Sequence, residues 1–177
     1  MDFAQDRGHY PAFRKVQIEA LNLAGVKYEV LEGDYSIEEI REIYRRTSIY
    51  FLASSEAFGM PICELQGCGS LVFTPDPYWP ASHWLGDDYY SKRESSLSPN
   101  FVVYENDAGK LAERIRAAAV AADPALVRHE FEAHQPELLH GSRETPRYFL
   151  DRVSSGSIHS LLHLDHVTVG RRGNQTQ

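Results

Sequence analysis

Apolar residues recur at helical spacing in three stretches of the chain. Residues 11–24 carry one apolar stripe, and residues 107–122 carry another that begins behind Asp107, a favoured helix N-cap residue. Between them, Ser36 stands ahead of a third stripe with Glu39 three positions later, which is the capping-box pattern. The spacing therefore predicts amphipathic helices over 11–24, after Ser36 and over 107–122.

A second set of segments has the pattern of β-strands. Residues 26–32 alternate apolar and polar side chains, as a half-buried strand does. Residues 48–53, 70–74 and 101–106 are mainly apolar runs of the kind that is covered on both faces in a parallel sheet. A helix with Pro61 in its first turn is predicted between the second and the third of these four strands.

Strands and helices thus alternate along the chain. This order calls for right-handed crossovers and predicts an α/β fold with a doubly wound, Rossmann-like parallel sheet. The 177 residues are enough for one such domain but not for two. We expect the α/β domain over 1–122, a helical C-terminal extension over 123–153, and a flexible tail over 154–177, which is rich in Ser, Gly, His and Arg.

Composition limits the partners and the compartment. A net charge of -7 would repel nucleic acid and anionic membranes, so we expect no nucleic-acid partner. No run approaches the roughly 18–20 apolar residues of a membrane-spanning helix, and the first residues lack the basic and apolar regions of a signal peptide. Cys63 and Cys68 lie five apart in one predicted helix, which favours packing roles over a mutual disulfide. We expect no transmembrane segment and a cytoplasmic location.

The segment from Ser54 to Glu64 has the features of a ligand site. It follows a predicted strand at its carboxyl end, where open α/β sheets bind their ligands. Gly59 lets the backbone approach a ligand closely, and the helix start behind it directs free N–H groups outward, which suits a phosphate. Glu56 and Glu64 would face the same crevice as hydroxyl acceptors, one toward a sugar ring and one toward a ribose. Two carboxylates would then bracket a diphosphate held by the backbone.

These residues resemble a known motif. Glu56 through Glu64 is similar to the Glu-x7-Glu motif of retaining glycosyltransferases with the GT-B fold. The surrounding SSEAFGMPICELQGCGSLVFTPD resembles their usual order of Ser, Glu, Phe-Gly and Pro, then Glu, then a small residue and Gly, then a strand. The resemblance covers about residues 12–122 and concerns the carboxyl-terminal, donor-binding domain of such an enzyme. It implies that the fold is a single GT-B half-domain.

The resemblance also implies roles for individual residues. In that family the first glutamate of the motif contacts the transferred sugar, the second holds the ribose, and the glycine backbone contacts phosphate. Glu56 is therefore the candidate catalytic residue. The candidate substrate-binding residues are those around the motif and one basic residue of the first helix: Ser55, Phe58, Gly59, Met60, Pro61, Glu64 and Lys15.

The activity implied by the resemblance is transfer of a glycosyl group, with retention, from a nucleotide-diphosphate sugar to an acceptor. The family needs no metal, and no cofactor is expected besides the donor substrate. The Asp-x-Asp metal motif of the other large glycosyltransferase fold does not occur in the sequence. The expected partners are the nucleotide sugar and either a separate acceptor-binding domain or a second copy of the chain in a homo-oligomer.

Other interpretations stay open at this point. A GT-B active site lies between two such domains, and the resemblance concerns only one of them. The chain could therefore be a non-catalytic nucleotide-sugar-binding module or a fragment of a longer enzyme. The same fold and a related site also occur in sugar epimerases. Lys15 has a simpler interpretation as a solvated residue on a helix surface.

Two further clusters have plainer interpretations. His159, His163 and His166 have the spacing of one helical face, but only Asp165 is at hand to complete a metal site, so a flexible tail is favoured. Residues 75–100 are too long and irregular for a simple connection and contain several aromatic residues. We expect this segment to be a loop beside the site whose aromatic rings pack over the domain.

Overall fold

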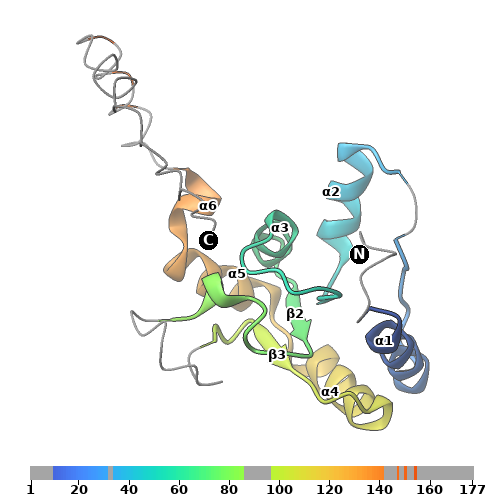
Figure 1. Cartoon of the computed structure of the whole chain (residues 1–177). Helices are drawn as coiled ribbons and strands as arrows, with labels where there is room; N and C mark the ends of the chain where they lie inside the picture. Colours follow the sequence, from blue (N-terminus) through green and yellow to red (C-terminus); the bar gives the residue numbers. More distant parts are fainter. Residues whose placement is uncertain are drawn as a thin grey trace, which may run out of the picture. The chain divides into compact units, whose positions relative to one another are not determined.

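The computed structural model describes residues 10–31, 34–85 and 97–141, together with Arg147, Leu150 and Ser154. The chain divides into two compact units, Met1–Leu139 and His140–Gln177, and the sheet lies in the first. The described helices and strands, drawn in Figure 1, are α1 (Tyr10–Ala24), α2 (Ile37–Arg46), β1 (Ile49–Phe51), α3 (Met60–Gly67), β2 (Leu71–Thr74), the 3-10 helix η1 (Ala81–His83), β3 (Phe101–Val103), α4 (Ala108–Ala121), α5 (Pro124–His134) and α6 (Pro136–His140).

The three strands form a parallel sheet in the order β1-β2-β3. Val72 of the central strand lies opposite Tyr50 of β1 and opposite Phe101 of β3. All three strands are apolar runs, as expected for strands that are covered on both faces. The α/β class and the parallel sheet predicted from the sequence are confirmed.

Successive residues of β2 enter two apolar clusters on opposite faces of the sheet. Val72 belongs to a cluster with Tyr44 of α2 and Leu65 of α3, whereas Phe73 belongs to a cluster with Leu111 of α4 and with side chains of α1. Both β2 side chains are fully buried, and burial of this kind stabilises a fold by about 1.5–3 kcal/mol per side chain. The sheet is therefore the middle layer of the fold (Figure 1). Helices α1 and α4 cover one of its faces, and α2 and α3 cover the other.

The helices predicted by the apolar spacing are present and keep their expected caps. The Ser36 hydroxyl accepts a hydrogen bond from the Glu39 amide at 3.2 Å, and the Glu39 carboxylate accepts one from the Ser36 amide at 2.8 Å. The hydrogen bond from the Ser36 amide to the carboxylate is the main cause that lowers the pKa of Glu39. The Asp107 carboxylate caps α4 by accepting from the Lys110 amide at 2.9 Å. Local sequence thus sets both helix starts.

The strand predicted over 26–32 is wrong, because residues 26–31 form no strand. A strand needs a neighbour that accepts and donates its backbone hydrogen bonds. Residues 26–31 and strand β1 line a common cavity of about 720 Å³ instead of pairing with each other. Tyr28 and Val30, two of the apolar positions of the predicted strand, are exposed. The alternating pattern is present, but the partner that would turn it into a strand is missing from the described sheet.

Beyond residue 122, helix α5 packs against α3. Gly69, two residues after the end of α3, has φ +92°, and a Cβ placed there would lie 2.6 Å from the Pro124 side chain. Close packing of this kind ties α5 to the sheet domain. The segment 154–177, expected to be a flexible tail, lies outside the described residues apart from Ser154.

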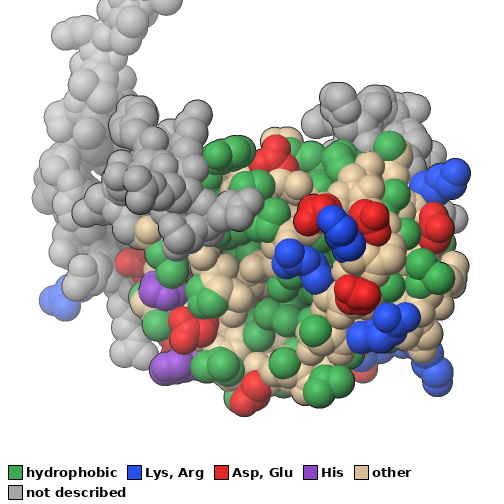
Figure 2. Space-filling model, turned by 90° about the horizontal axis from the view of Figure 1, so that it is seen from below, with side chains coloured by type: hydrophobic (Ala, Val, Ile, Leu, Met, Phe, Trp, Pro, Cys, Tyr) green, Lys and Arg blue, Asp and Glu red, His purple; other side chains and the backbone are tan. Residues whose placement is uncertain are grey.

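Among the helices in the described ranges, none combines the length and the apolarity that crossing a bilayer would require. Figure 2 shows acidic and basic side chains interspersed on the face that it displays, so neither sign of charge dominates there. Both cysteines are free. The packing role predicted for the two is confirmed for buried Cys63 and is wrong for Cys68, which is exposed at the end of α3.

Candidate functional site

The candidate site is the loop that joins β1 to α3 at the carboxyl edge of the sheet. Strand β1 ends at Phe51, and the next residue, Leu52, still donates its amide hydrogen bond to the Phe73 carbonyl of β2 at 2.8 Å. The Leu52 side chain is 1% exposed and anchors the root of the loop in the core. The chain then turns away from the sheet and enters α3 at Gly59. The loop therefore leaves a rigid strand at the edge where parallel sheets bind ligands.

Gly59 is the N-cap residue of α3. Its φ of +60° lies in the left-handed region that favours glycine, and its carbonyl accepts the first helical hydrogen bond, from the Cys63 amide at 3.2 Å. Gly59 provides no side-chain cap for this helix, and Pro61 in the first turn has no N–H to offer. The amides of Met60 and Ile62, together with the positive end of the helix dipole, are therefore the donors that this turn can present to an anion.

Glu56 packs directly on Gly59. A Cβ at position 59 would lie 2.6 Å from the Glu56 Cδ and 2.7 Å from its Oε1, with the Ile62 Cδ1 at 2.9 Å. These distances leave room for a hydrogen atom but not for a side chain. The structure thus brings two of the predicted site residues together, with the carboxylate of one against the Cα of the other at the start of α3.

Glu64 lies on the exposed side of α3, one turn further along. Burial is the main cause that raises the pKa of the Tyr44 hydroxyl to about 12 and that of the Cys63 thiol to about 11. The negative charges of Glu64 and Glu56 raise both values further. Both carboxylates thus lie close enough to Tyr44 and Cys63 for their charges to act on the same two groups.

The remaining predicted site residues are more dispersed. Ser55, Phe58 and Met60 are exposed on the loop, with exposed fractions of 39% for Phe58 and 57% for Met60, and Pro61 is partly buried. Lys15 is exposed on α1, and no hydrogen bond or ion pair between described residues joins it to either glutamate. Residues 47–91 contain no lysine or arginine. Any basic side chain that reaches a bound anion must come from another segment.

His83 is a residue of the site that sequence reasoning missed. Its Nε2 lies 2.9 Å from the Phe58 carbonyl oxygen, and the neighbouring Ser82 amide donates to the Ala57 carbonyl at 3.0 Å. The rings of His83 and Phe58 also stack, with centroids 6.2 Å apart and planes 13° apart. Helix η1 thus holds two consecutive carbonyls just ahead of Gly59 and fixes the loop from outside the motif.

The protonation of His83 follows from its partners. A carbonyl can only accept, so Nε2 carries the proton toward Phe58, while Nδ1 faces the Gln66 side-chain amide at 3.5 Å. Burial lowers the pKa of His83, although the hydrogen bond to Phe58 opposes this shift. The ring is 2% exposed. We therefore describe His83 as a neutral residue that positions the loop.

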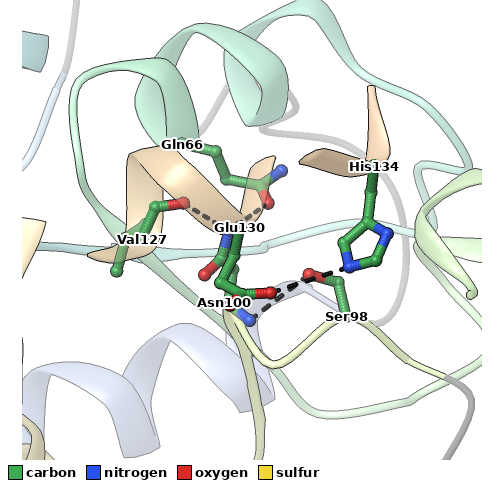
Figure 3. Close-up of polar contacts among 6 residues, drawn as sticks. All are labelled: Gln66, Ser98, Asn100, Val127, Glu130 and His134. Atoms are coloured by element: carbon green, nitrogen blue, oxygen red, sulfur yellow. Dashed lines mark hydrogen bonds and ion pairs between the residues drawn. The ribbon is translucent and has the colours of Figure 1, made fainter. Parts of the chain in front are cut away.

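The buried network continues from His83 through Gln66 to Asn100. Figure 3 shows the part of it around Asn100. The Gln66 Oε1 accepts from the Asn100 side-chain amide at 3.2 Å, and the same amide donates to the Val127 carbonyl of α5 at 2.9 Å. Gln66 and Asn100 are almost completely buried. Every described polar side-chain atom that is fully buried has a hydrogen-bond partner. The loop is thus connected through paired polar groups to α3, to the start of β3 and to α5.

The aromatic segment beside the site packs as predicted in its described part. Trp79 and Trp84 pack against the core cluster that contains Val72, and Trp84 donates its ring N–H to the Pro77 carbonyl at 3.0 Å. Tyr78 contacts Trp84 edge-on but is 49% exposed. His159, His163, His166 and Asp165 lie outside the described residues, as do Tyr89 and Tyr90. Within the described ranges, no group of three or more His, Cys, Asp or Glu is arranged to hold a metal ion.

Two cavities flank the site without including the glutamates. A cavity of about 110 Å³ is lined by Gln66, His83 and His134, among others, and the cavity of about 720 Å³ is lined by Tyr44 and by the edge of β1. Neither is lined by Glu56 or Glu64. Glu64 is exposed, whereas Glu56 is half-buried against Gly59, and neither of these two cavities is the crevice between the glutamates that the sequence predicted.

Comparison with known proteins adds no relative: the chain matches no protein-family model, no curated protein and no solved structure.

Proposed function

We propose that this chain is the donor-binding domain of a retaining glycosyltransferase and binds a nucleotide-diphosphate sugar for transfer to an acceptor. The observation that carries the proposal is the placement of the Glu56 carboxylate against Gly59, at an uncapped helix start on the carboxyl edge of a parallel sheet. It supports a site in which backbone amides that could bind an anion lie next to a carboxylate that could accept hydrogen bonds from sugar hydroxyls. The resemblance to the Glu-x7-Glu motif supplies the class of ligand.

The chemistry assigned to the site is electrostatic. The amides at the start of α3 would hold the diphosphate and stabilise the charge that develops on the leaving nucleotide, because their dipoles are already oriented before the reaction. Glu56 would accept hydrogen bonds from the sugar hydroxyls, and Glu64 would accept them from the ribose. The resemblance assigns the offset of the diphosphate charge to Lys15, with Arg14 next to it, and residues 47–91 contain no lysine or arginine that could take this role.

The first test measures nucleotide binding by the Glu64→Ala variant. Loss of charge-assisted hydrogen bonds to a ribose should weaken binding by about 1–3 kcal/mol, which is about 5- to 150-fold in Kd. A thermal-shift screen of uridine, guanosine and adenosine diphosphate sugars selects the donor, and calorimetry gives the Kd. Glu113→Ala, an exposed glutamate of α4, is the matched control and should bind like the parent chain. Equal affinity for Glu64→Ala and the control would remove Glu64 from the site.

Product analysis then separates the possible activities. Incubation of the selected donor with candidate acceptors should give a glycoside of retained anomeric configuration, and Glu56→Gln should abolish its formation. Epimerised or hydrolysed donor without an acceptor would instead identify an epimerase. Tight binding without any turnover would identify a binding module.

A further inference from the structure

The 3-10 helix η1 holds two consecutive carbonyls of the site loop. The Ser82 amide donates to the Ala57 carbonyl at 3.0 Å. The next carbonyl oxygen, that of Phe58, lies 2.9 Å from the His83 Nε2. The carbonyl and the N–H of a trans peptide group point in opposite directions, and every described peptide bond is trans. The N–H groups that share these two peptide planes, those of Phe58 and Gly59, therefore point away from η1.

These two amides lie immediately ahead of α3, whose first amide is that of Met60. Within the described ranges, no backbone hydrogen bond occupies the Phe58 or the Gly59 amide. Together with the Met60 amide they are three consecutive donors at the start of the helix. The direction of the first two depends on contacts that η1 makes from outside the motif.

A chain of buried amides determines what the other side of the His83 ring meets. The Gln66 Nε2 lies 3.5 Å from the His83 Nδ1 and also donates to the Ile62 carbonyl at 3.3 Å. The Gln66 Oε1 accepts from the Asn100 amide, which donates as well to the Val127 carbonyl (Figure 3). Backbone carbonyls can only accept, so these two carbonyls determine which end of each side-chain amide is the nitrogen. The end of Gln66 that faces His83 is therefore its N–H donor.

A donor at this place permits only one protonation state of the ring. The Phe58 carbonyl requires a proton on Nε2, and the Gln66 N–H requires a bare lone pair on Nδ1. A second proton, on Nδ1, would face another donor. The Gln66 amide cannot turn to accept it, because its nitrogen would then meet the Asn100 amide and its oxygen would meet the Ile62 carbonyl. Hydrogen-bond direction thus keeps His83 neutral, as does burial, which lowers its pKa.

Titratable groups lie on three of the segments around His83. His134 of α5 lines the same small cavity as His83, and its Nε2 lies 3.6 Å from the Glu130 carboxylate. Glu56 of the loop is half-buried, and Glu64 is exposed on α3. The causes that act on the pKa of His83 are burial and a backbone hydrogen bond. His134 is therefore the group that an acid titration has to separate from His83.

We propose that Gln66 and His83 are positioning residues of the candidate site. Gln66 keeps His83 neutral, and neutral His83 holds the Phe58 carbonyl so that the Gly59 N–H points out of the loop on the side away from η1. A second proton on His83 opposes the Gln66 N–H and displaces the ring, which makes the loop sensitive to acid. These hydrogen bonds exist in the free chain, so the inference is tested without a ligand, and only its effect on donor binding rests on the proposed function.

The first measurement is an NMR titration of the imidazole nitrogens in the full chain from pH 8 to about pH 5. His83 should carry a single proton on Nε2. It should bind a second proton at least about tenfold more weakly than an ordinary exposed histidine does. The loss of one signal in His83→Gln and of another in His134→Gln assigns the two rings. The His134→Gln variant should leave the titration of His83 unchanged.

Gln66→Glu should reverse the protonation of His83. The variant keeps the shape of the side chain but places a carboxylate oxygen, which can only accept, at the His83 Nδ1. His83 should then bind its second proton about 10- to 1,000-fold more tightly than in the parent chain. Asn106→Asp adds the same charge at an exposed residue and is the matched control, which should leave the titration as it is in the parent.

The second measurement follows the amide NMR signals of Phe58 and Gly59 in two variants at position 83. His83→Gln places an amide nitrogen about where Nε2 lies, so both signals should stay at their parent positions. His83→Asn is too short to reach the Phe58 carbonyl and should shift both signals. In a donor-binding assay, His83→Asn should weaken the affinity about fivefold and His83→Gln should restore it. A parent chain that binds no donor would remove the proposed function and leave the NMR result intact.

Three results would overturn the inference. The first is a single proton on Nδ1 of His83, or a second proton bound as tightly as by an exposed histidine, which would remove the role of Gln66. The second is an unchanged Gly59 signal in His83→Asn. The third is loss of the folded spectrum in both variants at position 83, which would make His83 a general structural residue. The titration of the parent chain decides the role of Gln66 even if Gln66→Glu fails to fold.

Discussion

Gly59 shows how one residue can set the geometry of the candidate site. Its backbone is in the left-handed region, and the space where a side chain would begin is occupied by the Glu56 carboxylate. The two constraints are independent, because the first concerns the backbone angle and the second concerns contact. Gly25, which ends α1 with φ +71°, has the first constraint without the second, since nothing lies within 4 Å of its missing Cβ.

This pair gives a residue-scale prediction. Gly25→Ala should cost only the left-handed conformation, about 1 kcal/mol. Gly59→Ala should cost more, by about a further 1–2 kcal/mol, because the new Cβ forces Glu56 to move. Urea unfolding of both variants measures the difference. Equal destabilisation of the two would mean that Glu56 does not pack on Gly59, and the central observation behind the proposed function would fall with it.

The sequence indicates some of these residue-scale features and hides others. The capping box and the glycine at a helix start depend on neighbours within a few positions, so their physical cause is visible in the sequence. The role of His83 depends on a hydrogen bond to the backbone carbonyl of Phe58, 25 positions earlier. Every residue has a backbone carbonyl, so the sequence does not show which carbonyl a side chain will bind. A lone histidine in an aromatic segment gives no signal that separates it from an ordinary packed residue.

At the scale of elements, the buried amides of Gln66 and Asn100 hold helices to the sheet. Asn100 stands just before β3 and donates to both α3 and α5. Both acceptors, the Gln66 Oε1 and the Val127 carbonyl, lie where water has little access. Inside α5 the Val127 carbonyl also accepts the regular helical hydrogen bond, so the Gln66 Oε1 is the acceptor that depends on this side chain.

Removal of that side chain should destabilise the fold. Asn100→Ala removes the donor to the buried Gln66 Oε1, and we expect a loss of about 1–3 kcal/mol in the free energy of unfolding. Asn106→Ala, at an exposed asparagine in the bend after β3, is the matched control and should change it by less than about 0.5 kcal/mol. Chemical denaturation of the two variants provides the measurement. A loss for Asn100→Ala as small as that of the control would show that water satisfies the Gln66 Oε1.

Elements were predictable where their cause is local or where burial on both faces demands an apolar run. The runs at β1, β2 and β3 and the stripes of α1 and α4 meet this condition. The segment 26–32 does not, because its alternation fits a strand only if another strand lies beside it. Strand formation is a property of pairs of segments. The sequence of one segment therefore predicts the tendency and not the outcome.

At the scale of the whole molecule, the core contains several weak acids that folding keeps protonated. Burial raises the pKa of Tyr44 and of Tyr104 to about 12 and that of Cys63 to about 11. They lie on α2, after β3 and on α3, and so span both helical layers. In the unfolded chain these groups release their protons from about pH 9 to 10. The free energy of unfolding should therefore be retained below about pH 9 and decline as pH rises toward 12.

Tyr104 allows this decline to be assigned to one group. Its hydroxyl oxygen accepts a hydrogen bond from the Gln17 side-chain amide at 2.7 Å, so Tyr104→Phe should be less stable than the parent chain near pH 8. Because the phenol titrates earlier in the unfolded chain, the parent loses stability from about pH 10 upward by up to about 1.4 kcal/mol per pH unit through this group, and the variant does not. The difference between the two proteins, measured by urea unfolding at pH 8, 9, 10 and 11, should shrink only over the upper part of that range. A constant difference would mean that the Tyr104 phenol is as accessible in the folded domain as in the unfolded chain, and that the α1, α4 and sheet layers do not exclude water around it.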